Sequence, residues 1–593
     1  MLNLESLLRI PDIDPGNGYS FSPDGRVAFA CNKSGRWEIY EFVLKQADEI
    51  VQVSRGPGGK FSPRYSPDGK FLAWAVDLDG SENFHIARMD RASGEIRDLT
   101  PDVDFAIQPS YAWSPDAKQI AYLADKENNF DLYTMDADGT NHRLLFRPGG
   151  PASFTRWSPA GTHIAVTAEK EVQTDGTFIV PLDGSPAKRI GGEEKPIDAW
   201  HPAWSPDGRR VAFSSNSGGW FQIGVYHLAD SHIEWLTDDA TDKLNPAWSP
   251  DGTRAAWVRS DGPTAWVEIR TGEADPQRVE MEAGFAYWPI FSPDGTSILF
   301  IHESPVRPFD LWCASLENFK AAPITDSLPA EFRSAEFVMP EAIRYPSFDG
   351  TLVPAMLYKA PGAGMHSPAI VLIHGGPTWH MAFFWYPLIA HMTSRGWTVI
   401  APNYRGSTGY GRAWQTANRY EMGRLDSDDC AAAVNYLVAN QLADPKKIGV
   451  TGRSHGGYLT MTCLTRNPEL FAVGSAVVPF LNWFTGHENS REDLQFWDIL
   501  NMGDPKEYHD LWHERSPFFF LDRVRAPVQL IAGENDTRCP PSEAREAHKK
   551  LTGLGLEAEL LIYEGEGHGF MKIENNIDSD LKLVKFLARY LET

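Results

Sequence analysis

The chain has 593 residues, of which 42% are apolar and 23% are charged, close to the average of a soluble globular protein. It carries 55 Lys and Arg against 79 Asp and Glu, a formal net charge of −24. The composition excludes disorder, collagen and coiled coil as first hypotheses, and the negative charge argues against nucleic acid as a partner.

The amino-terminal segment MLNLESLLRIPDID lacks the basic start, the long apolar core and the small-residue cleavage site of a signal peptide. No run approaches about 18 consecutive apolar residues, so no membrane-spanning helix is expected. The five cysteines form no C-x-x-C pair, which argues against a zinc finger or a disulfide framework and suits a reducing compartment. We therefore expect a soluble, cytoplasmic protein with no membrane partner.

A short Ser-Pro-Asp-Gly cassette, usually preceded by an aromatic residue, recurs through the first half of the chain. Its serines are about 45 residues apart and lie at Ser22, Ser66, Ser114, Ser158, Ser205, Ser249 and Ser292. Pro is favoured at the second position of a type I turn, and Asp and Gly suit the third and fourth. An alternating apolar segment follows each turn, as in Phe71–Ala75. Each cassette is therefore expected to form a β-hairpin.

The repeat length predicts the architecture of this half. A unit of about 45 residues has room for four short strands, the size of one β-propeller blade. Seven units then predict a seven-bladed propeller over residues 1–325, and regular spacing without linkers argues against an array of β-sandwiches. We expect the aromatic residue of each cassette to be a core residue between blades rather than a ligand contact. A propeller alone indicates no function, because many are binding scaffolds.

From about Arg333 the repeat disappears, and short apolar strands alternate with helix-length segments. This alternation predicts a parallel α/β sheet covered on both faces, over residues 326–593. The expected strands are Ala369–His374, Thr398–Pro402, Lys447–Gly452, Ala472–Val478, Pro527–Gly533 and Ala558–Tyr563. The expected helices include Asp426–Asn440, whose acidic start suits the helix dipole, and the terminal amphipathic segment Asp578–Leu591.

A G-x-S-x-G pattern, from Gly452 to Gly456, directly follows one predicted strand and precedes a helical run. A tight strand-to-helix turn leaves a serine hydroxyl exposed, and its glycines permit close packing, so this context favours a nucleophile at Ser454. The pattern alone is weak in a chain with 50 glycines. A Gly-rich turn at a strand end is the alternative.

A serine nucleophile needs a base, and the base needs an orienting acid, in the chain order Ser, Asp or Glu, His for this fold. Asp536 and His568 each follow one of the last two predicted strands, at the carboxyl ends where open α/β sheets place their sites. Taken singly, Asp536 fits a turn and His568 a surface histidine. Their order and placement together favour a triad with Ser454. Glu534, on the same turn as Asp536, is the second candidate for the acid.

A tetrahedral intermediate also needs hydrogen-bond donors for its oxyanion. The N–H of His455, directly after the nucleophile, is one expected donor. The second is expected from the N–H of Gly376, in the His-Gly-Gly-Pro sequence that follows an earlier strand. A plain Gly-Gly-Pro turn is the alternative interpretation.

Four motifs together resemble the prolyl oligopeptidase family of serine peptidases. They are HGGP from His374, NYRGSTGYG from Asn403 to Gly411, GRSHGGY from Gly452 and GHGF from Gly567. The resemblance covers the whole chain, because that family joins an N-terminal β-propeller to a C-terminal α/β-hydrolase domain. The compact size and the run Asp536-Thr537-Arg538 are most similar to the acylaminoacyl peptidase branch.

The resemblance implies that Arg538 contacts the substrate main chain, with a surface ion pair as the alternative. Tyr410 matches, in imperfect register, a tyrosine that donates its hydroxyl to the oxyanion in some relatives. The resemblance also implies that the propeller covers the site and limits substrates to short peptides. Relatives often assemble, which suggests a homodimer or a larger homo-oligomer.

Aromatic residues gather after the strand that follows the nucleophile. They fit either a hydrophobic pocket for the residue that precedes the cleaved bond or an ordinary core cluster. The residues are Phe480, Trp483, Phe484, Phe496 and Trp497.

We therefore predict a serine peptidase that cleaves short peptides through an acyl-enzyme. Ser454 attacks the carbonyl, His568 takes and returns the proton, and Asp536 fixes the imidazole tautomer. No metal, nucleotide or organic cofactor is implied. The alternatives are a dipeptidyl- or carboxypeptidase-type exopeptidase of the same family, an esterase or small-amide hydrolase, and a catalytically idle propeller scaffold. A dipeptidyl peptidase needs an acidic pair for the free amino terminus, and the flanks of Glu193-Glu194 do not resemble that motif.

Overall fold

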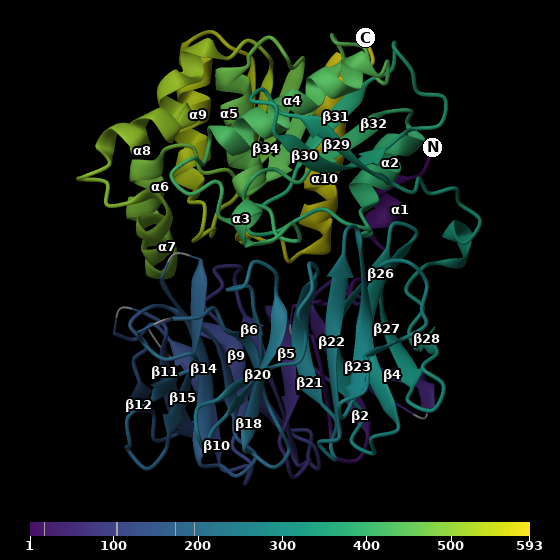
Figure 1. Ribbon diagram of the computed structural model, residues 1–593. Coiled ribbons are helices and arrows are strands. Elements are labelled where there is room, and N and C mark those ends of the chain that lie inside the picture. The colour runs from purple at the N-terminus through teal and green to yellow at the C-terminus, as the bar shows by residue number, and fades with distance from the viewer. Residues whose placement is uncertain (17, 45, 102–104, 128, 172, 195) are drawn as a thin grey trace. The chain divides into compact units, whose positions relative to one another are not determined.

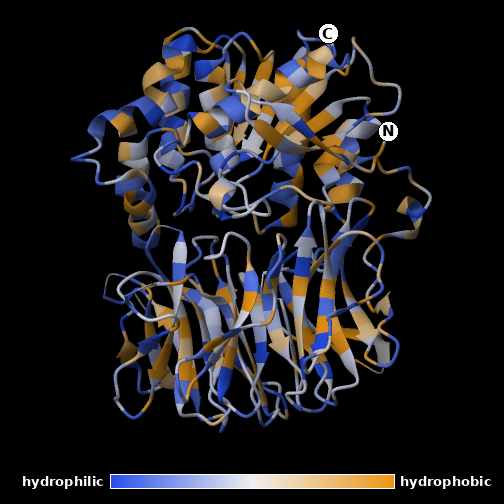
Figure 2. Ribbon diagram, in the orientation of Figure 1, coloured by the Kyte–Doolittle hydropathy of each residue, from blue (hydrophilic) through white to orange (hydrophobic). Residues whose placement is uncertain are grey.

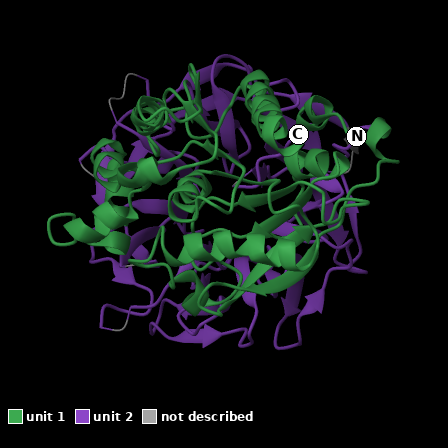
Figure 3. Ribbon diagram, turned by 90° about the horizontal axis from the view of Figure 1, so that it is seen from above, with its two compact units in different colours: residues 1–10, 79–81, 330–593 green, residues 11–78, 82–329 purple. Residues whose placement is uncertain are grey.

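The computed structural model describes residues 1–16, 18–44, 46–101, 105–127, 129–171, 173–194 and 196–593. The chain divides into two compact units (Figure 3). Unit 1 comprises Met1–Ile10, Asp79–Ser81 and Ala330–Thr593, and unit 2 comprises Pro11–Leu78 and Glu82–Pro329. The boundary expected between residues 325 and 326 stays a prediction; the long segments of the two units meet at Pro329 and Ala330.

Unit 2 is a β-propeller with seven four-stranded sheets in the described chain, which confirms the predicted seven blades (Figure 1). Four consecutive antiparallel strands form each blade. The first four blades are β1 (Tyr19–Phe21), β2 (Arg26–Cys31), β3 (Glu38–Val43) and β4 (Gln46–Gln52); β5 (Gly59–Tyr65), β6 (Phe71–Asp77), β7 (His85–Asp90) and β8 (Ile96–Asp98); β9 (Ile107–Trp113), β10 (Gln119–Ala124), β11 (Asp131–Asp136) and β12 (Arg143–Phe146); β13 (Ala152–Trp157), β14 (His163–Glu171), β15 (Thr174–Pro181) and β16 (Lys188–Arg189). The other three are β17 (Trp200–Trp204), β18 (Arg210–Ser215), β19 (Gln222–His227) and β20 (Ile233–Trp235); β21 (Asp242–Trp248), β22 (Arg254–Asp261), β23 (Thr264–Thr271) and β24 (Gln277–Arg278); β25 (Phe285–Phe291), β26 (Ser297–Ser304), β27 (Arg307–Ser315) and β28 (Ala321–Pro323).

The cassette turn joins the first and second strands of every blade, and its serine ties the turn together. In all seven cassettes the serine Oγ accepts a hydrogen bond from a backbone N–H four or five residues later, at 2.8 to 3.0 Å. Six of the serine hydroxyls also donate to the aspartate two residues later. The fourth cassette has Ala160 in place of that aspartate.

The cassette aromatic residues link neighbouring blades. The indole Nε1 of Trp113 donates to the carbonyl of Arg64 in the preceding blade at 3.2 Å, and that of Trp204 donates to Arg156 at 3.3 Å. Trp248 repeats the contact with Ala203 at 3.2 Å. A tryptophan with a buried ring needs a partner for its N–H, and the previous blade supplies it.

The first and last blades pack directly against each other. Val27 and Phe29 of β2 share one buried cluster with Leu299, Ile301 and Leu311 of β26 and β27. Burial of these faces closes the ring without a strand shared between the two blades.

Unit 1 contains an eight-stranded sheet in the order β29-β30-β32-β31-β33-β34-β35-β36. Strands β31 to β36 are parallel, and β29 and β30 add an antiparallel edge. The strands are β29 (Glu341–Pro346), β30 (Leu352–Tyr358), β31 (Ala369–Ile373), β32 (Thr398–Pro402), β33 (Ile448–Arg453), β34 (Val473–Val477), β35 (Val528–Gly533) and β36 (Ala558–Tyr563). All six predicted strands are present, and β29 and β30 were not predicted.

Helices cover both faces of this sheet. They are α1 (Leu4–Leu8), α2 (Pro387–Ser394), α3 (Arg412–Gln415), α4 (Leu425–Ala439), α5 (His455–Arg466), α6 (Trp483–Asn489), α7 (Glu492–Met502), α8 (His509–Arg515), α9 (Pro541–Gly553) and α10 (Ile573–Leu591), with short 3₁₀ helices η1 (Ala330–Phe332) and η2 (Pro517–Arg523). None of the described helices is long and apolar enough to cross a membrane.

Alternation along the strands decides which helices lie on which face. In β31, Ala369, Val371 and Ile373 pack with α4, α5 and α9, whereas Ile370 and Leu372 pack with α1, α2 and α10. Both faces are therefore buried, and the central strands are coloured mostly as hydrophobic in Figure 2.

The cassette serine generates a stability prediction. Ser249 is buried, and its Oγ accepts the N–H of Arg254 at 2.9 Å and donates to Asp251 at 2.6 Å. Ser249→Ala leaves the partly buried N–H of Arg254 without its acceptor, at a cost of about 1–2 kcal/mol. We expect the melting temperature to fall by about 2–4 °C in calorimetry. Ser153→Ala, at an exposed position of the same unit, is the control and should leave it unchanged.

Candidate active site

Ser454 lies in the turn between β33 and α5, in a strained conformation. Its φ of 60° and ψ of −124° are unusual for a residue with a side chain. Its N–H donates to the carbonyl of Val477 in β34 at 2.9 Å, and its carbonyl accepts the N–H of Tyr458 at 2.9 Å. These bonds hold the turn, so the strain is retained where the hydroxyl is presented.

The glycines of this turn are required by close packing. A Cβ at Gly456 would lie 2.2 Å from the carbonyl oxygen of Ile373, and one at Gly452 would lie 2.5 Å from the same atom. Any side chain would push β31 away from the turn. The G-x-S-x-G pattern thus reflects the contact between two neighbouring strand ends.

Ser454, His568 and Asp536 form one continuous hydrogen-bonded chain. The Ser454 Oγ lies 2.9 Å from the His568 Nε2, and the His568 Nδ1 lies 2.9 Å from the Asp536 Oδ2. In this arrangement the hydroxyl donates to Nε2 and the Nδ1–H donates to the carboxylate. The imidazole is placed to remove the hydroxyl proton when the oxygen attacks an electrophile.

The turn after β35 holds the acid. Asp536 is buried, and its Oδ1 accepts the backbone N–H of Arg538 at 2.9 Å and that of Cys539 at 2.8 Å. The Oδ1 atom therefore fixes the turn, and the Oδ2 atom orients the imidazole of His568. Glu534 is exposed and has no such contact with His568.

Two residues that the sequence analysis missed anchor the His568 loop. The buried carboxylate of Glu566 accepts the N–H groups of Met571 at 2.7 Å and Lys572 at 3.2 Å, and the Asn575 amide at 2.7 Å. From the other side, the Arg453 Nη1 donates to the carbonyl of His568 at 2.9 Å. Their positions inside the catalytic motifs, Gly-Glu-Gly-His and Gly-Arg-Ser, were the signal in the sequence that could have identified them.

Backbone donors lie beside the nucleophile. His455 is the first residue of α5, where N–H groups are unpaired within the helix and favour negative charge. Gly376 has a φ of 122°, which favours glycine, and lines the same cavity as Ser454 and His455. The His374 side chain supports this loop through its Nε2, 2.8 Å from the Ser407 Oγ.

A cavity of about 170 Å³ opens at Ser454. Three of the five predicted aromatic residues line it, namely Phe480, Trp483 and Trp497, together with Arg538. Nothing in the sequence singled out the further lining residues, which include Thr378, His487, Ser490, Leu494, Asp498 and Cys539. Helices α6 and α7 supply most of them, and their part in the wall depends on how they fold back towards Ser454.

The remaining predicted residues lie outside the cavity lining. Phe484 packs on Trp512, with ring centroids 5.7 Å apart, and Phe496 is half-buried on α7. The Tyr410 hydroxyl accepts a hydrogen bond from the Asn403 Nδ2 at 2.7 Å. The structure records no contact between Tyr410 and Ser454 in the described chain, so the role of its hydroxyl at the oxyanion stays a prediction.

An imidazole and a carboxylate form one side of the cavity. The His487 Nδ1 lies 3.0 Å from the Asp498 Oδ2, and both side chains are largely buried. Burial raises the pKa of Asp498 to about 6, although the hydrogen bond from His487 opposes this shift. The charge of the cavity therefore changes within the range of pH 5 to 7.

Comparison with known proteins places this geometry in a family. Residues 383–593 match the model described as the prolyl oligopeptidase family, and residues 14–181 and 126–331 match that of the TolB beta propeller domain. Through residues 383–593, the chain is assigned to the prolyl oligopeptidase family. It is a serine-type peptidase, and the predicted family and fold class are confirmed.

The relatives within this family carry several names. The chain is 33% identical to Dipeptidyl peptidase family member 6 of Caenorhabditis elegans, over 37% of this chain and only 31% of that protein. It is 26% identical to Dipeptidyl aminopeptidase BIII of Pseudoxanthomonas mexicana, over 89% of this chain and 86% of that protein.

Solved structures share the fold. A puromycin-hydrolyzing peptidase of Mycobacterium tuberculosis has a TM-score of 0.86 at 21% identity and covers 100% of this chain and 96% of its own. An acylaminoacyl peptidase of Pyrococcus horikoshii has a TM-score of 0.75 at 18% identity, over 100% of this chain and 98% of its own.

The two candidate acids can be separated by mutation. We expect Asp536→Asn to lower kcat on a peptide anilide about 10³- to 10⁴-fold, because the amide no longer fixes the imidazole tautomer. Glu534→Gln is the matched control and should retain wild-type kcat. A large loss in Glu534→Gln with normal activity in Asp536→Asn would reverse the assignment of the acid.

Proposed function

We propose that this peptidase hydrolyses short peptides through an acyl-enzyme, with the substrate preference of an acylaminoacyl peptidase. The observation that carries the proposal is the unbroken hydrogen-bonded chain from Ser454 through His568 to Asp536, beside an aromatic-walled cavity. Its catalytic steps follow from these contacts.

The Ser454 Oγ attacks the substrate carbonyl carbon, and its proton moves to the His568 Nε2. Asp536 stabilises the imidazolium through the Nδ1–H. The C–N bond then breaks, and the amine leaves with the proton from Nε2, so that the acyl group remains on Ser454. Water, deprotonated by the same nitrogen, releases the acid in the second half.

The developing oxyanion receives the N–H groups of Gly376 and His455. Both are backbone donors, His455 at the start of α5 and Gly376 in the loop after β31, and neither depends on a side-chain rotamer. Removal of one such donor costs about 2.7–4 kcal/mol in comparable enzymes.

The cavity residues favour a substrate with a blocked amino terminus. A free ammonium group needs carboxylates, and the carboxylate that lines this cavity, Asp498, is already bonded to His487. Arg538 is exposed at the cavity and carries donors suited to peptide carbonyl groups. The fold similarity to an acylaminoacyl peptidase supports this preference.

Other exopeptidase activities of the family are the second candidate, because a relative matched over most of its length is named a dipeptidyl aminopeptidase. The Glu193 Oε2, in the acidic pair of unit 2, lies 3.4 Å from the Lys170 Nζ, and the Glu193 side chain is largely exposed. An esterase or small-amide hydrolase uses the same machinery. The limit to short peptides, tested with a folded protein as substrate, and homo-oligomer formation stay predictions.

Matched substrates test the proposal. We expect an N-acetylated peptide anilide to be cleaved with a kcat/KM at least tenfold above that of its free-amine form, and Ser454→Ala to abolish both activities. Preference for the free amine would support a dipeptidyl peptidase instead. Turnover of an aryl ester alone would replace the peptidase with an esterase.

The cavity charge gives a pH prediction. Asp498 is neutral below its pKa of about 6 and charged above it. An apolar substrate side chain must desolvate the charged form. We expect the wild-type KM for a phenylalanyl anilide to rise about 3- to 10-fold from pH 5 to pH 7, measured as a ratio to the KM of Asp498→Asn at the same pH. Asp493→Asn, on the same helix but paired with Arg491, is the control and should follow the wild type. Equal profiles for wild type and Asp498→Asn would contradict the prediction.

A further inference from the structure

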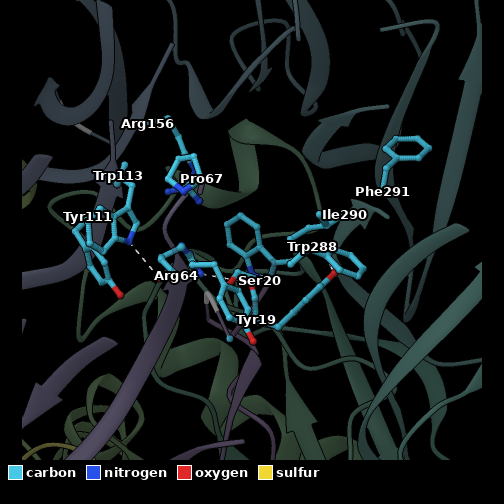
Figure 4. Close-up of a pocket in the computed structure, with 14 residues that line it drawn as sticks. Tyr19, Ser20, Arg64, Pro67, Tyr111, Trp113, Arg156, Trp288, Ile290 and Phe291 are labelled. Atoms are coloured by element: carbon cyan, nitrogen blue, oxygen red, sulfur yellow. Dashed lines mark hydrogen bonds between the residues drawn. The ribbon is translucent and has the colours of Figure 1, made fainter. Parts of the chain in front are cut away.

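Unit 2 holds a second cavity, of about 380 Å³, among the ends of its inner strands. Figure 4 shows its lining, which comes from blades one, two, three, four and seven. Half of the lining residues are aromatic, with Tyr19, Trp113 and Trp288 among them, and the lining contains two arginines, Arg64 and Arg156. Its size lies at the lower end of the range of small-molecule sites, about 300–1,000 Å³.

The two arginines occupy the same position in different repeats. The residue directly before the cassette aromatic is, in chain order, Ser20, Arg64, Ala112, Arg156, Ala203, Ala247 and Ile290. The first four of these and Ile290 line the cavity. Small or apolar side chains are therefore compatible with this position of the fold. The arginines add charge that the propeller does not need.

The backbone of this position has a structural task, which its side chain does not share. The carbonyl groups of Arg64, Arg156 and Ala203 each accept an indole N–H from the next blade. Because Ala203 fulfils this task equally well, the task itself does not require a guanidinium group at this position.

Arg156 lacks a carboxylate partner in the described part of the chain. Its Nη1 donates to the carbonyl of Thr155 at 3.0 Å, and its guanidinium carbon lies 4.0 Å from the ring centre of Phe154. Burial lowers the pKa of Arg156, and the nearby charge of Arg64 lowers it further, with no acidic group acting in the opposite direction. Arg156 is half-buried at the cavity, and a charge partly withdrawn from water is normally paired, so an anion in the cavity would stabilise it.

Arg64 lies in a different environment. Its Nη1 donates to the carbonyl of Pro63 at 2.8 Å, and the negative charge of Asp14 acts on its pKa against the effect of burial. Two guanidinium groups thus face one cavity. The negative charge of Asp14 acts on Arg64 and not on Arg156. A bound anion would reduce the mutual repulsion of the two guanidinium groups.

We propose that this cavity binds the carboxylate of a short peptide or N-acylated amino acid that carries an aromatic or large apolar side chain. The planar guanidinium fork of Arg156 suits a carboxylate, which it can bind through two parallel hydrogen bonds. The walls of Trp113, Trp288 and Phe291 suit the apolar side chain. A simple oxyanion such as phosphate would leave these aromatic surfaces uncovered.

This site differs from the catalytic cavity, since all of its lining residues belong to unit 2. It therefore extends beyond the proposed function and does not depend on it. Its ligand is of the kind that a peptidase releases, a product with a new carboxylate.

Photo-cross-linking locates the site directly. The probe is N-acetyl-p-benzoylphenylalanine, used on Ser454→Ala protein and compared with its carboxamide, and labelled peptides are mapped by mass spectrometry. We expect the free acid to label peptides that contain Tyr19, Tyr111 or Trp288. The carboxamide should label them at least tenfold less. Equal labelling by acid and carboxamide would overturn the proposal.

Variants test the guanidinium. Arg156→Met should reduce this labelling at least tenfold, whereas Arg209→Met, at an exposed position of a cassette turn, should not change it. Labelling that persists in Arg156→Met would overturn the proposal. In competition, N-acetylphenylalanine should protect the site at concentrations where inorganic phosphate does not, and equal protection by phosphate would overturn the peptide assignment.

The melting temperature of unliganded Arg156→Met separates binding from folding. Removal of an unpaired, half-buried cation should leave the melting temperature unchanged or raise it. A fall of more than about 5 °C would assign Arg156 a structural role and overturn the proposal. Arg156→Lys keeps the charge but lacks the planar fork, so we expect at least threefold less labelling, and unchanged labelling would contradict the two-bond geometry.

Discussion

The parallel register of one sheet is the constraint on which the catalytic geometry depends. Parallel strands end at the same edge, so the turns after β33, β35 and β36 lie together although long segments separate them in the chain. Within that edge, each catalytic side chain is held from its own backbone outward. Ser454 is held through Val477, Asp536 through two N–H groups of its turn, and His568 by its neighbours. The hydrogen-bonded chain is thus formed by turns that follow the strand ends of one sheet and are tied by their own hydrogen bonds.

The propeller uses few side chains to maintain its fold. Each cassette serine accepts a backbone N–H of the next strand, and tryptophans of the third, fifth and sixth cassettes donate to the blade before. These contacts use the serine, the aromatic ring and a backbone carbonyl. They leave the side chain that precedes the aromatic residue free to vary, which is where Arg64 and Arg156 occur. A repeat can therefore carry an arginine at this position and still form the same blade.

Some charged side chains of this protein are paired with an opposite charge, and others are not. The Lys60 ammonium lies 3.0 Å from the Glu38 carboxylate with both side chains buried, and Arg405 binds Asp429 through two nitrogens. Such pairs offset the cost of burial and fix local structure. Arg156 has no equivalent partner in the described residues, and Asp498 has an imidazole beside an open cavity. Of the two, Arg156 is the group that an anion in its cavity would pair.

The sequence by itself determined the seven blades, the six parallel strands and the order Ser454, Asp536, His568, because turn chemistry and strand periodicity are local properties. It did not predict β29 and β30, whose pairing depends on contacts with the rest of the sheet. It also missed Glu566, Arg453 and the cavity residues Leu494 and Asp498, and it left Phe484 and Phe496 undistinguished from Phe480. Which side chains meet across distant segments depends on how helices fold back over the sheet, and only the tertiary structure fixes that packing.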